Sequence, residues 1–213
     1  SLSFAQLNLS LKRELDSIYV LDQKYRELLN VVSKEESKAD SLVKVYQVKR
    51  EDLTSHLWRL QTQADTSNMI RVKKIVAQYG YPGKSMVGTP TNEAVFYVIQ
   101  HSKEIDVYLP IVQKAAEEKE LAFPLYAMML DRSLMYQGKA QIYGTQGHGF
   151  EATNPETKKK GFKMVIWPIK DPESVNERRK AAGFTQTVEE NARRLGIEYK
   201  VYTIEDIQQR RVY

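Results

Sequence analysis

The chain has 213 residues, of which 42% are hydrophobic and 28% are charged, a composition typical of globular proteins rather than of disordered or collagen-like ones. It contains no Cys, which excludes disulfide scaffolds, thiolate nucleophiles and cysteine zinc sites. The net charge of +5 is small and spread along the chain, so we do not expect nucleic-acid binding. The longest apolar runs are far shorter than the ~20 residues of a membrane-spanning helix, so we predict no transmembrane segment.

The first six residues resemble the small-residue end of a bacterial secretion signal, with a possible cleavage after Ala5. On this resemblance we expect a periplasmic or secreted protein. Because the charged and apolar parts of such a signal are missing, a trimmed cytoplasmic start stays an alternative.

Apolar residues at steps of four and three predict a helix over residues 7–32 with one buried stripe. Ser33 to Glu36 then reads as a capping box, which predicts a second, more polar helix to about residue 63. The two helices should form an antiparallel N-terminal helical hairpin over residues 7–63.

Four further helices are predicted over residues 68–78, 94–101, 105–120 and 123–136. The helix over 94–101 is apolar on every face, which is typical of a buried helix. Together they would make a buried helical core over residues 64–138.

Alternation and β-branched residues predict strands over 141–146 and 162–167, joined as a hairpin, and another strand over 198–203. Helices are predicted over 172–182 and 187–195. The expected fold is mainly α (α+β): a single compact helical domain over 1–213, with a small β-hairpin or sheet near 141–167 and 198–203 and C-terminal helices after residue 139.

Polar residues stand at four places where packing would prefer apolar ones, and a buried charge needs a partner. Asp131 and Arg132 interrupt an apolar helix, so we expect pairs of Asp22 with Arg132 and of Asp131 with His101 or Arg26. The candidate ligand-binding residues are Asp22, Gln23, Arg26, Gln100, Arg132, Gln141, Tyr143, Thr145 and Gln146.

A set of short motifs spans the chain in order: Asp22-Gln23 with Arg26, Gly80-Tyr-Pro82, Gln100-His101, Asp131-Arg132, Gln141 to Gln146, and Trp167-Pro-Ile with Asp171-Pro. Over about residues 20–185 this set resembles a bacterial family known as domain of unknown function 6624. The resemblance implies that these positions belong together, and it implies no reaction.

Two classes of function fit these residues. In the first, a small-molecule or peptide-binding enzyme of hydrolase-like type, His101 acts as general acid or base, Asp131 orients it and Arg132 holds an anionic group. In the second, a non-catalytic structural or interaction protein, the polar cluster only locks the helices. We predict no cofactor and no metal ligand, although a metal site at His148 and Glu151 stays an alternative. The sequence contains no feature that predicts an oligomeric state.

Overall fold

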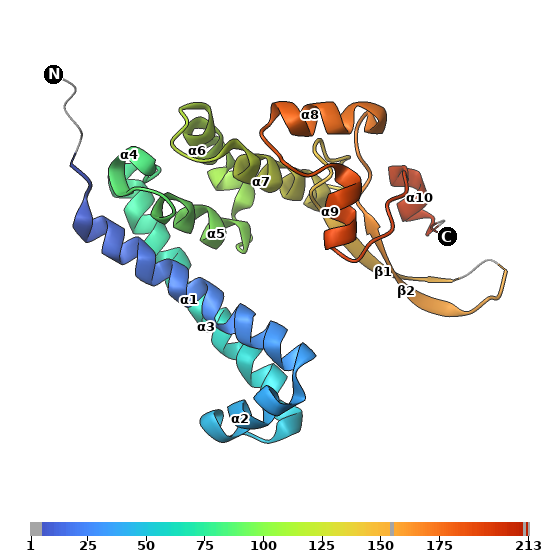
Figure 1. Ribbon diagram of the computed structural model, residues 1–213, viewed down its shortest axis with the longest axis horizontal. Helices are drawn as coiled ribbons and strands as arrows, with labels where there is room; N and C mark the ends of the chain where they lie inside the picture. Colours follow the sequence, from blue (N-terminus) through green and yellow to red (C-terminus); the bar gives the residue numbers. More distant parts are fainter. Residues whose placement is uncertain (1–5, 154–155, 211, 213) are drawn as a thin grey trace. The chain divides into compact units, whose positions relative to one another are not determined.

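The computed structural model describes residues 6–153, 156–210 and 212, so the expected cleavage after Ala5 lies outside the described residues. The chain divides into two compact units, Ser1–Leu121 and Ala122–Tyr213, which we call unit 1 and unit 2 and describe one at a time. The single domain over 1–213, with boundaries after residues 63 and 138, stays a prediction. The mainly α fold is confirmed, because helices and one two-stranded sheet make up the regular structure of the described residues (Figure 1).

Unit 1 is helical. It contains α1 (Leu9–Lys34), α2 (Glu36–Tyr46), α3 (Leu53–Tyr79), α4 (Lys84–Val87), α5 (Ala94–Gln100) and α6 (Ile105–Glu117), with short 3₁₀ turns at Arg50–Asp52 and Thr91–Glu93. Its core is aliphatic and aromatic, and its large, fully buried members include Leu15, Ile18, Leu53, Leu57, Val72, Phe96 and Ile99. The all-round burial predicted for the helix over 94–101 is found in α5, where only Tyr97 is not buried.

The N-terminal hairpin is formed by α1 and α3 rather than by α1 and one helix from 34 to 63 (Figure 1). The predicted helix is broken at Gln47, which adopts a left-handed φ of 53°, and α3 then runs on through the helix expected over 68–78. The capping box at Ser33 is wrong: Ser33 lies in the last turn of α1, and its hydroxyl donates to the carbonyl of Asn30.

Polar bonds join the two helices of the hairpin at successive turns. Side chains of α3 donate to backbone carbonyls of α1: Arg71 to Glu14 (3.3 Å), Asn68 to Ile18 (3.0 Å) and Gln61 to Asp22 (3.3 Å). The partner numbers rise on one helix as they fall on the other, so the pair is antiparallel. We call this row of contacts the α1–α3 seam.

Unit 2 contains α7 (Phe123–Tyr136), β1 (Gly147–Thr153), β2 (Lys160–Ile166), a 3₁₀ turn at Pro172–Ser174, α8 (Val175–Ala181), α9 (Val188–Arg194) and α10 (Ile204–Gln208). The hairpin strands pair antiparallel, with Gly147 opposite Ile166 and Thr153 opposite Lys160. Inward-facing residues of the hairpin pack with α10 in one cluster, and Ile166 packs with α8 and α9 in a second.

Two strand predictions are wrong. Residues 141–146 form no strand, because their backbone turns around a carboxylate from α7 and the first strand starts only at Gly147. Residues 198–203 also alternate in polarity but run without regular structure to the capping box of Thr203, which begins α10. The helix expected over 187–195 is found as α9, which begins with a capping box between Thr187 and Glu190.

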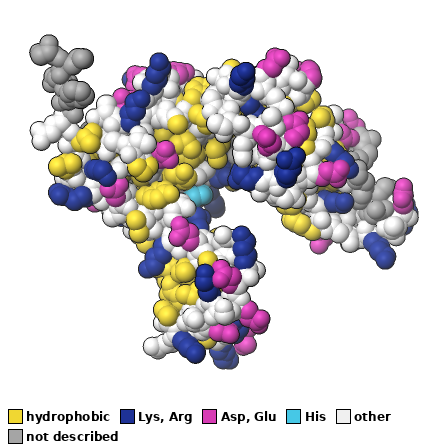
Figure 2. All heavy atoms as spheres, viewed as in Figure 1, with side chains coloured by type: hydrophobic (Ala, Val, Ile, Leu, Met, Phe, Trp, Pro, Cys, Tyr) yellow, Lys and Arg dark blue, Asp and Glu magenta, His cyan; other side chains and the backbone are white. Residues whose placement is uncertain are grey.

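Charge is mixed on the surface of both units. Figure 2 shows Lys and Arg interspersed with Asp and Glu over the visible face, in keeping with the even spread of charge in the sequence. Among the described residues, none of the helices is both long enough and apolar enough to cross a bilayer.

Candidate functional site

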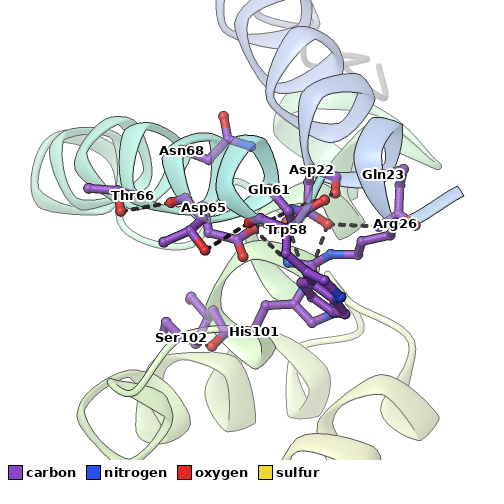
Figure 3. Close-up of polar contacts among 12 residues, drawn as sticks. Asp22, Gln23, Arg26, Trp58, Gln61, Asp65, Thr66, Asn68, His101 and Ser102 are labelled. Carbon is purple, nitrogen blue, oxygen red and sulfur yellow. Dashed lines mark hydrogen bonds and ion pairs between the residues drawn. The ribbon is translucent and has the colours of Figure 1, made fainter. Parts of the chain in front are cut away.

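A polar cluster occupies the interior of unit 1 between α1, α3 and the end of α5 (Figure 3). Its centre is the carboxylate of Asp22, which is 0% exposed. Gln23 Nε2 donates to Asp22 Oδ2 (2.7 Å), and Arg26 Nη2 lies 3.7 Å from Asp22 Oδ1, one helical turn further along α1. The burial expected from the interrupted stripe is therefore found, and the charge is partnered from its own helix.

The cluster extends from Arg26 to α3. Arg26 Nη2 donates to Asp65 Oδ1 (2.5 Å), and Gln61 Nε2 donates to the same oxygen (2.7 Å). Gln61 Oε1 and Arg26 Nε are buried and have no hydrogen-bond partner among the described residues, which places two unsatisfied polar atoms in this one cluster.

His101 connects the cluster to the surface. It directly follows α5, and its Nδ1 lies 3.4 Å from the Asp22 carboxylate. Its side chain is 21% exposed, whereas Asp22 has no exposed surface. The imidazole thus has a buried carboxylate on one side and solvent within reach on another.

The exposed side of His101 lines an open pocket of about 390 Å³ that lies wholly within unit 1. One wall is a stripe of α3 with helical spacing, and the other is the turn between α5 and α6. The lining residues are Thr62, Asp65, Thr66, Met69, Ile70, Lys73, His101, Ser102, Lys103 and Glu104. This volume lies within the range of small-molecule sites.

The charge of the same carboxylate also acts on Tyr97 of α5. Burial raises the pKa of Tyr97, and the charges of Glu93 and Asp22 add to the rise, so the ring keeps its proton at neutral pH. Burial also raises the pKa of Glu93, and its hydrogen bond with Tyr97 acts against that rise.

Unit 2 holds a second polar cluster, centred on Asp131 of α7, which is also 0% exposed. Its carboxylate accepts from the backbone N–H groups of Ile142 (2.7 Å), Tyr143 (3.1 Å) and Thr145 (3.0 Å) and from the Thr145 hydroxyl (2.9 Å). Burial raises the pKa of Asp131, and these hydrogen bonds oppose the rise. Asp131 therefore organises the loop over residues 141–146.

Amide side chains complete this loop. Gln141 is fully buried and donates to the carbonyls of Gln146 (3.0 Å) and Trp167 (2.7 Å), while its own oxygen accepts from the Gln146 N–H (2.9 Å). Arg132 Nε donates to Gln146 Oε1 (3.0 Å). The loop is thus held by side chains from both of its ends and from α7.

Arginines of α8 hold the other side of the loop. Arg178 donates to the carbonyl of Ile142 (3.2 Å), and Arg179, which is 2% exposed, donates to the carbonyl of Tyr143 (2.8 Å). The Tyr143 ring contacts Phe123 and Phe184. Burial and the Asp131 charge raise the pKa of Tyr143.

The candidate residues therefore fall into two groups. The structure brings Asp22, Gln23, Arg26 and His101 together in unit 1, with Gln100 buried at the end of α5. It brings Asp131, Arg132, Gln141, Tyr143, Thr145 and Gln146 together in unit 2. The expected pairs of Asp22 with Arg132 and of Asp131 with His101 or Arg26 join one unit to the other and stay predictions.

Sequence reasoning missed Gln61 and Asp65. The signal was present in α3, where a stripe of buried positions at helical spacing includes Leu53, Leu57, Gln61, Ala64, Asn68, Val72 and Ile75. Gln61 and Asn68 interrupt this stripe as Asp22 interrupts that of α1, and Asp65 follows Gln61 by one turn.

The alternative metal site at His148 and Glu151 does not fit the strand geometry. Both residues lie on β1, three apart, so their side chains point to opposite faces of the hairpin. His148 packs against Phe150 and Trp167. Within residues 6–153, 156–210 and 212, no three His, Asp or Glu side chains are grouped so that they could hold a metal ion.

Comparison with known proteins identifies one family. The profile described as Family of unknown function (DUF6624) matches residues 47–203, a span that contains His101 and the unit 2 cluster and begins after Asp22, Gln23 and Arg26. The expected span of about 20–185 is thus shifted toward the C-terminus. No curated protein and no solved structure matches the chain. Because the matched span covers well over half of its length, the chain belongs to the DUF6624 family.

Proposed function

We propose that unit 1 carries a general acid–base site that binds a small molecule or peptide in the pocket beside His101. The observation that carries this proposal is the position of His101, which contacts a fully buried carboxylate and also lines a pocket of about 390 Å³. In this proposal Asp22 orients the imidazole, the role that the sequence assigned to Asp131.

The pairing suits proton transfer. In this proposal His101 Nδ1 faces the Asp22 carboxylate at 3.4 Å and donates to it, and Nε2 is the atom that accepts a proton from a ligand. A covalent serine mechanism is not supported at Ser102, because its hydroxyl donates to the Ile99 carbonyl (2.8 Å) and accepts from the Glu104 N–H (3.0 Å). Arg132 and the loop of unit 2 stay proposed as ligand-binding residues.

The competing proposal is a non-catalytic helix lock, and the same cluster offers an observation in its favour. Asp22 and Arg26 join Gln61 and Asp65 across α1 and α3, which would fix the register of the hairpin whether or not a ligand exists. The two proposals differ in what His101 contributes, because a helix lock needs Arg26 but not an imidazole at a pocket.

The test is a hydrolysis screen of chromogenic esters, amides and phosphoesters with the wild type and three variants. His101→Gln and Asp22→Asn should lower the rate of the best substrate by roughly 10²–10⁴-fold, the usual contribution of general acid–base catalysis. His56→Gln is the matched control, because His56 also lies in unit 1 but contacts Arg59 and Tyr46 at the surface. Wild-type turnover that survives His101→Gln, or no turnover at all, would overturn the catalytic proposal in favour of the helix lock.

A further inference from the structure

We infer that the pocket beside His101 recognises its ligand by a protonated amine carried on a short apolar skeleton, with Asp65 as the anion that receives it. The inference deepens the proposed function and rests on it for the identity of the site. It is carried by the hydrogen-bonding state of the residues that line the pocket.

The hydroxyl groups that line the pocket already donate hydrogen bonds to backbone carbonyls of the protein. Thr62 donates to the Trp58 carbonyl (3.0 Å), Thr66 to the Thr62 carbonyl (2.9 Å) and Ser102 to the Ile99 carbonyl (2.8 Å). Each oxygen can still accept a hydrogen bond from a ligand, but none has a free proton to give. The hydroxyls of the pocket therefore complement a donor rather than an acceptor.

The charged groups of the pocket also favour a ligand that donates hydrogen bonds. Both hydrogen bonds to Asp65 end on Oδ1, from Arg26 and from Gln61, and its side chain remains 31% exposed on the pocket wall. The other oxygen, Oδ2, can thus accept a further bond. Lys73, by contrast, is engaged with Glu104 at 2.6 Å. Asp65 and His101 line the same pocket, and Figure 3 shows both near the Arg26 side chain.

One residue of the pocket, Lys103, would favour an anionic ligand instead. It lines the pocket, and the structure gives it no ion pair among the described residues. Its side chain is exposed, however, and an exposed ammonium on a flexible stem attracts an anion only weakly in water. Asp65 is already held in place by two donors, so it offers a fixed acceptor at lower entropic cost.

Apolar side chains supply the rest of the recognition. Met69 and Ile70 lie on the α3 wall of the pocket, and Ile70 is 53% exposed. Trp58 lies one turn before Thr62 on the same helical stripe and is 54% exposed. An indole at this edge can contact either the carbon skeleton of the ligand or its cationic group.

The test measures binding of benzylamine, benzyl alcohol and benzoate to the full chain by amide chemical shifts, without any turnover. Benzylamine should shift residues in 62–73 and 101–104 saturably and bind about tenfold more tightly than the neutral alcohol. Asp65→Asn should remove that advantage. Asp40→Asn, an exposed acid of α2 that pairs with Arg50, should leave it unchanged. Preference for benzoate would assign the site to anions through Lys103, and equal binding of amine and alcohol would overturn the role of Asp65.

Further measurements distinguish a failure of this inference from a failure of the proposed acid–base function. Phenylalanine amide should bind more tightly than its N-acetyl derivative, because acetylation removes the charge, and equal binding of the two would overturn this inference. Benzylamine binding that persists in a protein whose hydrolysis does not depend on His101 would overturn the proposed function alone. Hydrolysis that depends on His101 without amine preference would overturn this inference alone. If Asp65→Asn fails to fold, the comparison of benzylamine with benzyl alcohol on the wild type still decides.

Discussion

Replacing Asp131 should destabilise unit 2 in steps that follow the hydrogen bonds lost. In Asp131→Asn one oxygen can keep the bonds from the Ile142 and Tyr143 N–H groups, while the new amide nitrogen faces the Thr145 N–H. The Thr145 N–H then loses its acceptor, and the Thr145 hydroxyl, which donates to the same oxygen, must turn to accept from the new amide; together these changes cost about 1–3 kcal/mol. In Asp131→Ala all three N–H groups and the Thr145 hydroxyl lose their acceptor, and we expect about 3–5 kcal/mol after the loop relaxes.

Urea unfolding followed by tryptophan fluorescence can resolve these steps. The chain has two Trp residues, so Trp58→Phe leaves Trp167 as the reporter, and Trp167 is 9% exposed within unit 2. Asp171→Asn is the matched control, because Asp171 is an exposed acid of the same unit in a left-handed conformation that Asn tolerates. It should change the free energy of unfolding by less than about 0.5 kcal/mol. If Asp131→Ala falls within the range of this control, the carboxylate does not organise the loop.

Three other predictions follow from unit 1 and from the sequence. Arg26→Met should lower the free energy of unfolding by about 3 kcal/mol, measured by urea denaturation, because the buried Asp22 loses its cation; no change would show that Asp22 is stabilised by other groups. The pKa of Glu93 is raised in the folded state, so its protonated form contributes stability that is present below the ordinary Glu value and lost as pH rises through the folded value. Glu93→Gln should therefore gain stability relative to the wild type between pH 4 and pH 7 in paired urea titrations, and a constant difference would contradict the shift. Export stays a prediction, and fractionation of cells that make the native full-length protein should recover it outside the cytoplasm rather than in the cytosol.

The helices could be predicted because apolar periodicity reports burial directly. The break between α2 and α3 could not, because it occurs at Gln47 in a stretch with neither Gly nor Pro. The residues over 141–146 alternate in polarity as a strand does, yet their N–H groups bond to Asp131. A carboxylate on α7 thus overrides the local pattern, and the sequence of residues 141–146 alone does not indicate this interaction.

The candidate site shows the same limit in its chemistry. An interrupted apolar stripe indicates that Asp22 is buried and needs partners, and the structure confirms the burial. The interrupted stripe does not indicate which residues those partners are. Arg26 is one turn away and could be named, whereas Gln61 and Asp65 come from α3, about 40 residues further along the chain. Sequence reasoning therefore locates buried polar residues better than it pairs them.

The α1–α3 seam has a consequence for how the hairpin can fail. The acceptors at Glu14, Ile18 and Asp22 are main-chain carbonyls spaced four residues apart, so α1 presents a similar row of oxygens after sliding by four residues, about 6 Å. Those bonds alone barely distinguish the native alignment from its slipped neighbour. Side chains break the degeneracy, and the buried charge of Asp22 is one of them, because a slide of α1 would carry it away from His101. A chain without that charge should discriminate less strongly against the slipped alignment, so mutations at Asp22 should appear as conformational heterogeneity as well as unfolding.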